Sequence, residues 1–163
     1  MIFKFLSKNF YISFSIVALI YFLDRFTKVY VIQLDRNNLG SDIFNSAYLN
    51  IILIWNKGIA FGLLSFSESD LYNIISLIIA IIIIVLVIMS LKNQGFQRYS
   101  LLMIVGGAIG NLQDRIFFNA VHDFIDFHIG NFHWFIFNVS DIFITLGVLI
   151  LILREFIFKN KDQ

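Results

Sequence analysis

Cysteine and proline are both absent from the 163 residues of this chain. Without cysteine, disulfides, thiolate nucleophiles and cysteine-ligated metal sites are excluded, so any chemistry depends on other polar side chains. Charged residues are also scarce, at 14% of the chain, whereas ordinary soluble domains carry about 25%. The net charge of +1 provides no concentrated basic surface of the kind that binds phosphates, so no nucleic-acid partner is expected.

Apolar residues take the place of the missing charges. They make up 59% of the chain, which is too much for one soluble core, but a bilayer accommodates them in helices that satisfy their own backbone. A helix of about 20 residues crosses about 30 Å of hydrocarbon. The sequence predicts four such helices, over residues 10–32, 71–91, 99–118 and 137–158. We therefore expect an all-α membrane protein with four transmembrane helices, forming one domain over residues 1–163.

The segment 33–70 between the first two helices is more than a linker. Residues 47–54, AYLNIILI, have the composition of a strand, and residues 55–62 form a glycine-punctuated turn. We expect a small β/loop subdomain on the outer face of the membrane. The turn is a candidate flap over a bound substrate.

Basic residues predict the orientation in the membrane. Three segments, before the first helix, between the second and third, and at the end of the fourth, contain Lys4, Lys8, Lys92, Arg98, Arg154, Lys159 and Lys161. Segment 33–70 has four acids against two bases, and segment 119–136 has no Lys or Arg. By the positive-inside rule both termini are cytoplasmic, and segments 33–70 and 119–136 face outward. The first helix is expected to be retained, because Asp24 and Arg25 stand where a signal peptide would have its small-residue cleavage site.

With this topology the acidic residues gather at the outer membrane face. Asp24, Asp114 and Asp141 lie at the outer ends of the first, third and fourth helices, and Asp123 lies in the connection that follows the third. A charge at membrane depth costs at least ~2.5 kcal/mol on insertion scales, so each carboxylate is a candidate functional group. Asp24 and Lys28 are four residues apart on one helix face and can neutralise each other, which favours a structural role.

Amides accompany these acids on the third and fourth helices. The third helix has one polar stripe formed by Gly107, Gly110, Asn111 and Asp114. Gly106 and Gly110 form a pair of small residues that lets helices approach closely. Asn138 and Asp141 are three residues apart on the fourth helix. We expect Asn111 and Asn138 to bond to each other across the seam and align the carboxylates.

Two carboxylates held close together cannot both ionise easily, so one keeps a proton near neutral pH. Such a pair can hydrolyse a peptide bond, because the anion takes a proton from water while the protonated partner binds the carbonyl oxygen. Of the four candidates, Asp114 is followed by Arg115, which favours an ionised structural role. Asp123 and Asp141 have no adjacent base. They are the predicted catalytic pair.

Five motifs occur in order along the chain. They are DRFTK at 24–28, NKGIAFG at 56–62, GGAIGNLQDRI at 106–116, VHDFIDF at 121–127 and FNVSDIFI at 137–144. In this order the motifs resemble those of the lipoprotein signal peptidases, the bacterial type II signal peptidases. The resemblance implies that Asp123 and Asp141 are catalytic, in agreement with the chemical argument. It also implies substrate-binding or supporting roles for Asn56, Asn111, Asp114, Arg115, Asn138, Asp24 and Lys28.

The resemblance further implies the substrate and the setting. The substrate is a prolipoprotein whose cysteine already carries diacylglycerol, and the cut falls on the N-terminal side of that cysteine. The enzyme is expected in the bacterial cytoplasmic (inner) membrane, among membrane lipids, with globomycin as inhibitor and without a cofactor. A monomer is expected, since the sequence has no sign of an oligomer. His122 and Ser140 depart from the residues common in the family.

Three other interpretations use the same residues. His122, His128 and His133 share a loop with Asp123 and Asp126, but no spacing there matches a compact metal-ligand motif, so no metal site is predicted. A transporter or proton relay could use the same acids, although such sites usually lie at the membrane midplane. A purely structural helical subunit would not explain why carboxylates recur without matching bases.

Overall fold

The computed structural model describes residues 8–38, 42–58 and 69–159. Four helices run side by side, α1 (Lys8–Asn37), α2 (Ser69–Lys92), α3 (Gly95–Phe118) and α4 (Val139–Lys159). Within the described residues, α1, α2 and α3 are long and apolar enough to cross a membrane. α4 differs because it is more charged near its ends. Each stretch of eighteen residues within its 21 residues contains three charged residues, drawn from Asp141, Arg154, Glu155 and Lys159. The predicted helices are all present, whereas length and composition identify three of them as membrane spans.

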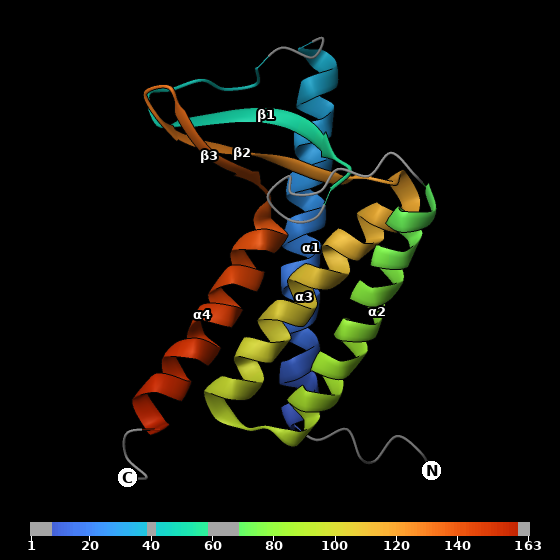
Figure 1. Cartoon of the computed structure of the whole chain (residues 1–163), viewed down its shortest axis with the longest axis vertical. Helices are drawn as coiled ribbons and strands as arrows, with labels where there is room; N and C mark the ends of the chain where they lie inside the picture. Colours follow the sequence, from blue (N-terminus) through green and yellow to red (C-terminus); the bar gives the residue numbers. More distant parts are fainter. Residues whose placement is uncertain (1–7, 39–41, 59–68, 160–163) are drawn as a thin grey trace.

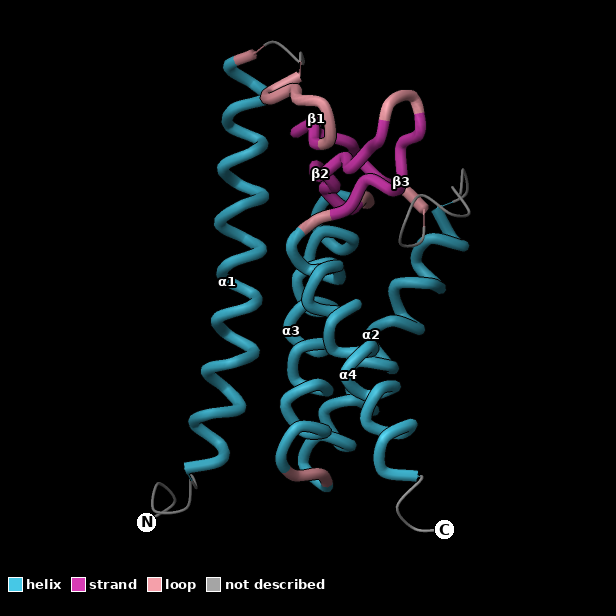
Figure 2. Tube along the Cα trace, turned by 90° about the vertical axis from the view of Figure 1, so that its left-hand side faces the viewer, coloured by secondary structure: helices cyan, strands magenta, loops and turns pink. Residues whose placement is uncertain are grey.

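α1 is longer than a bilayer requires. Its 30 residues extend about 45 Å at 1.5 Å per residue, compared with about 30 Å of hydrocarbon. The helix therefore continues past the predicted end at residue 32, and Figure 2 shows its last turns standing beside the sheet. The first residues of α1 and the last of α4 lie at the opposite end of the molecule from the sheet (Figures 1 and 2).

A three-stranded antiparallel sheet covers one end of the helices. Its strands are β1 (Leu49–Asn56), β2 (Val121–Ile129) and β3 (Phe132–Phe137), in the order β1-β2-β3. β1 confirms the strand predicted at 47–54. The other two strands come from the connection between α3 and α4, not from the segment between α1 and α2, so the predicted β/loop subdomain was incomplete.

β2 has the alternation of apolar and polar residues typical of a strand only in its second half, IDFHI at 125–129, where the polar side chains are the buried ones. Its first four residues are all buried, so polar and apolar side chains alike are covered by protein. A two-residue turn joins β2 to β3, and Gly130 adopts the positive φ of 59° that favours glycine in such hairpins. The alternating run and the Gly-Asn pair at 130–131 together form a local hairpin signal that the sequence analysis did not use.

Glycines on α3 allow α1 and α4 to pack closely against it. A Cβ atom on Gly107 would lie 2.5 Å from the backbone oxygen of Ser140, and one on Gly110 would lie 2.6 Å from both Asp24 Oδ2 and Ser140 Oγ. Any larger side chain at either position would separate the helices. The polar stripe predicted on α3 thus faces protein, at the junction of α1, α3 and α4.

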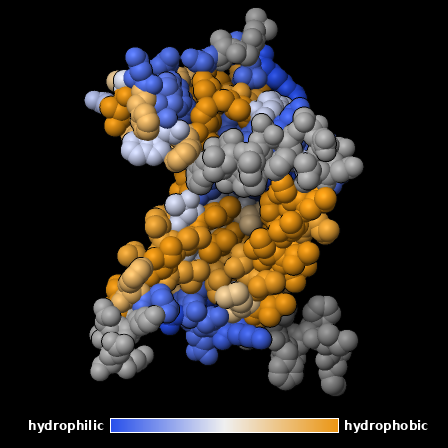
Figure 3. Space-filling view, viewed as in Figure 1, coloured by the Kyte–Doolittle hydropathy of each residue, from blue (hydrophilic) through white to orange (hydrophobic). Residues whose placement is uncertain are grey.

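The outer surface of the helices is apolar. Large side chains such as Phe14, Phe22, Leu77 and Ile84 are more than half exposed. On the face seen in Figure 3, apolar residues cover the middle of the molecule. Hydrophilic residues gather at its lower end and are mixed with apolar residues in its upper part. Exposed apolar area of this extent is the surface of a protein embedded in lipid.

Candidate active site

A buried ionic cluster joins α1 to α3. Asp114 accepts hydrogen bonds from Arg25 Nη1 at 2.6 Å, and Lys28 Nζ lies 2.8 Å from its other oxygen. Asp24 lies 2.9 Å from Arg25 Nη2 and 3.0 Å from Lys28 Nζ, as expected from the four-residue spacing. Two acids and two bases leave the cluster neutral, which is the condition under which charges are tolerated in a protein interior.

Asp114 is ionised for a different reason from the one the sequence predicted. Its bases are Arg25 and Lys28 of α1, whereas Arg115, the neighbour in sequence, points elsewhere. Successive residues of a helix face different directions, since each is rotated by about 100° from the last. The adjacency of Asp114 and Arg115 in the sequence was therefore misleading, although the structural role inferred for Asp114 fits the cluster.

The first turn of α4 is anchored on this cluster. The backbone N–H of Ser140 donates to Asp24 Oδ1 at 3.1 Å. A buried carboxylate beside a helix N-terminus satisfies one of the free N–H groups and interacts favourably with the helix dipole. The sequence analysis did not identify this role of Asp24, because the contact joins residues that are 116 positions apart.

Asn138 and Asp141 cap α4 by a reciprocal pair of bonds. The N–H of Asp141 donates to Asn138 Oδ1 and the N–H of Asn138 donates to Asp141 Oδ2, both at 3.1 Å. This is the arrangement of a capping box, in which the residues at the cap and three positions later satisfy each other's backbone. It explains why the helix begins at Val139, and it orients the Asp141 carboxylate.

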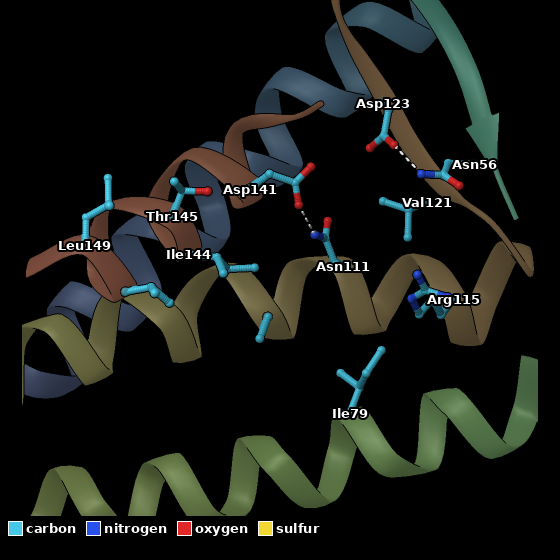
Figure 4. Close-up of a pocket in the computed structure, with 12 residues that line it drawn as sticks. Asn56, Ile79, Asn111, Arg115, Val121, Asp123, Asp141, Ile144, Thr145 and Leu149 are labelled. Atoms are coloured by element: carbon cyan, nitrogen blue, oxygen red, sulfur yellow. Dashed lines mark hydrogen bonds between the residues drawn. The ribbon is translucent and has the colours of Figure 1, made fainter. Parts of the chain in front are cut away.

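The second oxygen of Asp141 is held from α3. Asn111 Nδ2 donates to Asp141 Oδ1 at 2.8 Å, and Asn111 Oδ1 accepts from Lys28 Nζ at 2.8 Å. Asn111 thereby connects the ionic cluster to Asp141 (Figure 4). Because Lys28 occupies the amide oxygen, the amide NH2 group is oriented toward the carboxylate.

Asp123 of β2 is held by two amides. Asn138 Nδ2 donates to Asp123 Oδ1 at 2.6 Å, and Asn56 Nδ2 donates to Asp123 Oδ2 at 2.8 Å. We expected Asn111 and Asn138 to bond to each other, and this was wrong. Each amide instead binds a carboxylate, because an ionised acceptor makes a stronger hydrogen bond than another amide does.

Burial and, to a smaller extent, the negative charge of Asp141 raise the pKa of Asp123 to about 6, against the opposing effect of the Asn56 and Asn138 amides. The side chain is 2% exposed. A carboxyl group with a pKa in this range can hold and release a proton near neutral pH, which is the property required of an acid or base catalyst.

Arg115 supports Asn56. Its Nη2 atom donates to the carbonyl of Gly58 at 2.6 Å, and the N–H of Gly58 donates to Asn56 Oδ1 at 2.8 Å. The guanidinium also lies over the ring of Tyr72, 5.2 Å from its centroid. Gly58 and Tyr72 are partners that the sequence analysis missed. Residues 59–62 of the predicted flap lie outside the described residues.

The two carboxylates of Asp123 and Asp141 stand at the polar end of a cavity of about 440 Å³. In Figure 4 they point into the same space, from β2 and from the first turn of α4. The polar lining is completed by Asn56, Asn111 and Arg115. The rest of the wall is mainly apolar and comes from α2, α3, β2 and α4: Ile79, Ala108, Val121, Ile144, Thr145, Val148 and Leu149.

The three histidines do not form one cluster. His122 lies between the rings of Trp55 and Phe118, with its Nδ1 atom 3.2 Å from Asp114 Oδ1. His128 and His133 lie together beside Asp126 on the sheet. None of the three histidines is among the described residues that line the cavity, so the described part of the chain offers no histidine ligand at the carboxylate pair.

Comparison with known proteins agrees with this arrangement. The model of the family described as signal peptidase (SPase) II matches residues 16–157. The chain belongs to the signal peptidase II family. It is therefore a protease of the kind that processes lipoproteins.

Individual relatives of this chain are named lipoprotein signal peptidases. The lipoprotein signal peptidase of Pelagibacter ubique (strain HTCC1062) is 51% identical over 154 residues, which cover 94% of this chain and 93% of that protein. The one from Anaplasma phagocytophilum (strain HZ) is 40% identical over 142 residues, covering 86% and 88%. These matches extend over nearly the whole of this signal peptidase II.

Two solved structures share the fold. Both are described as bacterial membrane enzymes, determined by the in meso method. One has a TM-score of 0.75 at 29% identity and covers 93% of this chain and 91% of its own. The other has a TM-score of 0.71 at 31% identity and covers 87% and 90%. This signal peptidase II therefore has the architecture of an integral membrane enzyme.

Proposed function

We propose that this signal peptidase II removes signal peptides from diacylglyceryl-modified prolipoproteins, cutting on the N-terminal side of the lipidated cysteine, with Asp123 and Asp141 as its catalytic pair. One observation carries the proposal. Two carboxylates, oriented by amides and backbone N–H groups, meet at the polar end of an otherwise apolar cavity among the helices.

The cavity suits an amphiphilic substrate. A signal peptide and a diacylglyceryl group are both apolar, and the apolar wall formed by side chains such as Ile79, Ile144 and Leu149 can bury them. The scissile peptide bond is polar and would lie at the other end, beside the carboxylates. A substrate anchored at its apolar parts presents that bond in a fixed orientation, which reduces the entropic cost of the reaction.

The chemistry requires one proton on the pair. The anionic carboxylate takes a proton from water, the resulting hydroxide attacks the scissile carbonyl carbon, and the protonated carboxyl donates a hydrogen bond to the carbonyl oxygen. The tetrahedral intermediate then collapses, and a proton passes to the leaving amine as the C–N bond breaks. Burial favours the protonated form of both carboxyl groups. We assign the proton of the reactive form to Asp123, whose pKa of about 6 lets a fraction of the molecules carry it near neutral pH. We assign the anion to Asp141, which lies in the first turn of α4, where the helix dipole favours negative charge.

The supporting residues fall into two groups. Asn56, Asn111 and Asn138 orient the two carboxylates through their amides. Asp24, Lys28 and Asp114 hold α1 against α3 and α4, and Arg115 holds Asn56 through Gly58. Globomycin is expected to inhibit by occupying the same cavity, and the enzyme is expected to act as a monomer.

We further propose that all four helices cross the bacterial cytoplasmic membrane, with both termini inside and the carboxylate pair near the outer face. In α4 the residues 142–153 carry no charge, while Arg154 and Glu155 follow at the end away from the sheet. Because the chain has no cysteine, single cysteines can report the topology. Asn37→Cys should react with an impermeant maleimide in intact spheroplasts and Gln94→Cys only after lysis; the reverse pattern would contradict this orientation.

The decisive assay for the catalytic pair uses purified protein and a diacylglyceryl-modified prolipoprotein, with cleavage followed by gel shift. Wild type should cleave with or without a chelator, and both Asp123→Asn and Asp141→Asn should abolish cleavage. Asp42→Asn, at an exposed position outside the cavity, is the matched control and should retain activity. Cleavage by either carboxylate variant at the wild-type rate would exclude that residue from the pair.

A further inference from the structure

A second cluster of polar side chains lies on the sheet, away from the cavity. Asp126 and His128 are two residues apart on β2, across an irregularity in the register, and both are buried while Phe127 between them is exposed, so they lie on the same face of the strand. His128 pairs with His133 of β3 in the sheet register. One donor atom from each of these three residues lies within 4.8 Å of the other two. The hairpin thus brings together one carboxylate and two imidazoles.

The distances within this cluster lie on either side of those expected for a small divalent cation. His133 Nδ1 lies 2.9 and 3.0 Å from the two Asp126 oxygens, and His128 Nδ1 lies 3.9 Å from Asp126 Oδ2. Zinc bonds of about 2.0–2.2 Å in a tetrahedral site imply donor atoms about 3.3–3.6 Å apart. Small rotations of the two histidine rings would bring all three donors to such a spacing.

His128 provides a separate indication that something binds here. The residue is 7% exposed, and its buried Nδ1 atom has no hydrogen-bond partner among the described residues. Buried polar atoms normally have a partner, so an exception needs an explanation. This atom belongs to the same cluster as Asp126 and His133, and a bound metal ion would satisfy it.

The carboxylate is oriented as in known metal sites. Asn50 of β1 lies opposite Asp126 in the register and donates from Nδ2 to Asp126 Oδ2 at 3.2 Å. Partners of this kind fix the orientation of a ligand and raise metal affinity. Because the carboxylate oxygen has two lone pairs, this hydrogen bond leaves it able to coordinate an ion.

We propose that Asp126, His128 and His133 bind one divalent transition-metal ion of the Zn²⁺ class, with water as the fourth ligand. The side chain of His133 is 53% exposed, which gives the ion a path of entry and leaves room for that water. Nitrogen and carboxylate donors in this number are typical of zinc. The ion would tie β2 to β3 and so stabilise the strand that carries Asp123.

This site uses three of the five residues that the sequence analysis weighed as a metal site and set aside. None of its three ligands is among the residues that line the cavity, so the ion takes no part in the chemistry of the carboxylate pair. The ligand spacing, Asp-x-His followed by His five residues later, is not compact along the chain. It becomes compact only because the hairpin pairs His128 with His133.

The test is a Zn²⁺ titration of the full chain, purified in detergent through a tag that contains no histidine and then stripped with a chelator. Wild type should bind one equivalent per chain, and Co²⁺ should show the visible absorption of a tetrahedral site. His133→Ala should weaken Zn²⁺ binding by at least about 100-fold, since even the loss of an outer partner costs 10–100-fold. Asp126→Asn should do the same, while Asp42→Asn should bind as wild type does.

A second readout is thermal stability. Zn²⁺ should raise the unfolding temperature of wild type in a saturable manner, because a ligand that binds only the folded state stabilises it. The same addition should leave His133→Ala unchanged, and His133→Gln serves in its place if the alanine variant does not fold. No saturable binding by wild type, or equal affinity in the His133 variants, would overturn the proposal.

Discussion

Replacing Asp123 by Asn is expected to abolish cleavage and also to change stability in a way that depends on pH. The pKa of Asp123 is raised from an ordinary value of 3.8 to about 6, so the folded protein holds this proton more tightly than the unfolded chain does. Stability is therefore lost as pH rises from 3.8 through 6. Above that window the full cost is about 3 kcal/mol, at about 1.4 kcal/mol per pKa unit.

An Asn side chain has no charge to bury, so the variant escapes this cost. It introduces a smaller one, because its NH2 group must face the amide donor of either Asn56 or Asn138. A buried donor without an acceptor costs about 1–3 kcal/mol. Asp123→Asn should therefore equal or exceed wild type in stability at pH 7.5 by up to about 2 kcal/mol, and be less stable than wild type by about 1–2 kcal/mol at pH 4.

The assay is denaturant unfolding in mixed detergent micelles, followed by the fluorescence of Trp55 and Trp134 and repeated at pH 4 and pH 7.5. The informative quantity is the change, with pH, in the stability difference between variant and wild type, because the amide conflict is the same at both pH values. We expect a change of about 2–3 kcal/mol in favour of the variant at the higher pH. Asp42→Asn should show none. A difference that does not vary with pH would refute the argument from the buried carboxylate.

Three further substitutions test the surrounding structure. Asp114→Asn removes the negative charge that faces Arg25 and Lys28 and turns one of the two acceptor oxygens into an NH2 donor; the imbalance of buried charge should cost about 3–5 kcal/mol, seen as a lower unfolding temperature in detergent, and a neutral effect would contradict the ionic cluster. Gly110→Ala places a Cβ atom 2.6 Å from Asp24 Oδ2, and overpacking of this kind costs about 1–3 kcal/mol or more, so unfolding temperature and activity should fall together. Arg115→Ala should weaken substrate and globomycin binding about tenfold or more by releasing Gly58 and Asn56, an effect of at least about 1.4 kcal/mol; unchanged KM and inhibition would remove Arg115 from the site.

Some of the site was predictable from sequence because it depends on local geometry. The i, i+4 spacing of Asp24 and Lys28 places them on one helix face wherever the helix lies. The spacing of Asn138 and Asp141 matches a reciprocal helix cap, and the structure uses it as one. The helix positions follow from apolar runs of membrane length, since the bilayer requires the backbone to be satisfied within each segment.

Other features needed contacts between distant residues. The bases that pair with Asp114 lie 86 to 89 positions before it, so the sequence offered only the adjacent Arg115 as a partner. The strands β2 and β3 were missed although IDFHI at 125–129 alternates as a strand does; its polar residues are the buried ones and its apolar residues are more exposed, which reverses the usual pattern. Asn111 and Asn138 were correctly singled out, but each binds a carboxylate and not the other amide.

The sequence by itself determined the membrane-embedded helical character of this protein and the family to which it belongs, and it predicted the residues that carry its chemistry. These depend on apolar run length, residue type and spacing, all of which are properties of the chain. Only the tertiary structure decided which amide holds which carboxylate, how Arg115 supports Asn56, and that Asp126, His128 and His133 meet on one hairpin. The first two depend on packing between segments far apart in the chain, about which local spacing carries no information. The third depends on the register of one hairpin, which pairs His128 with His133.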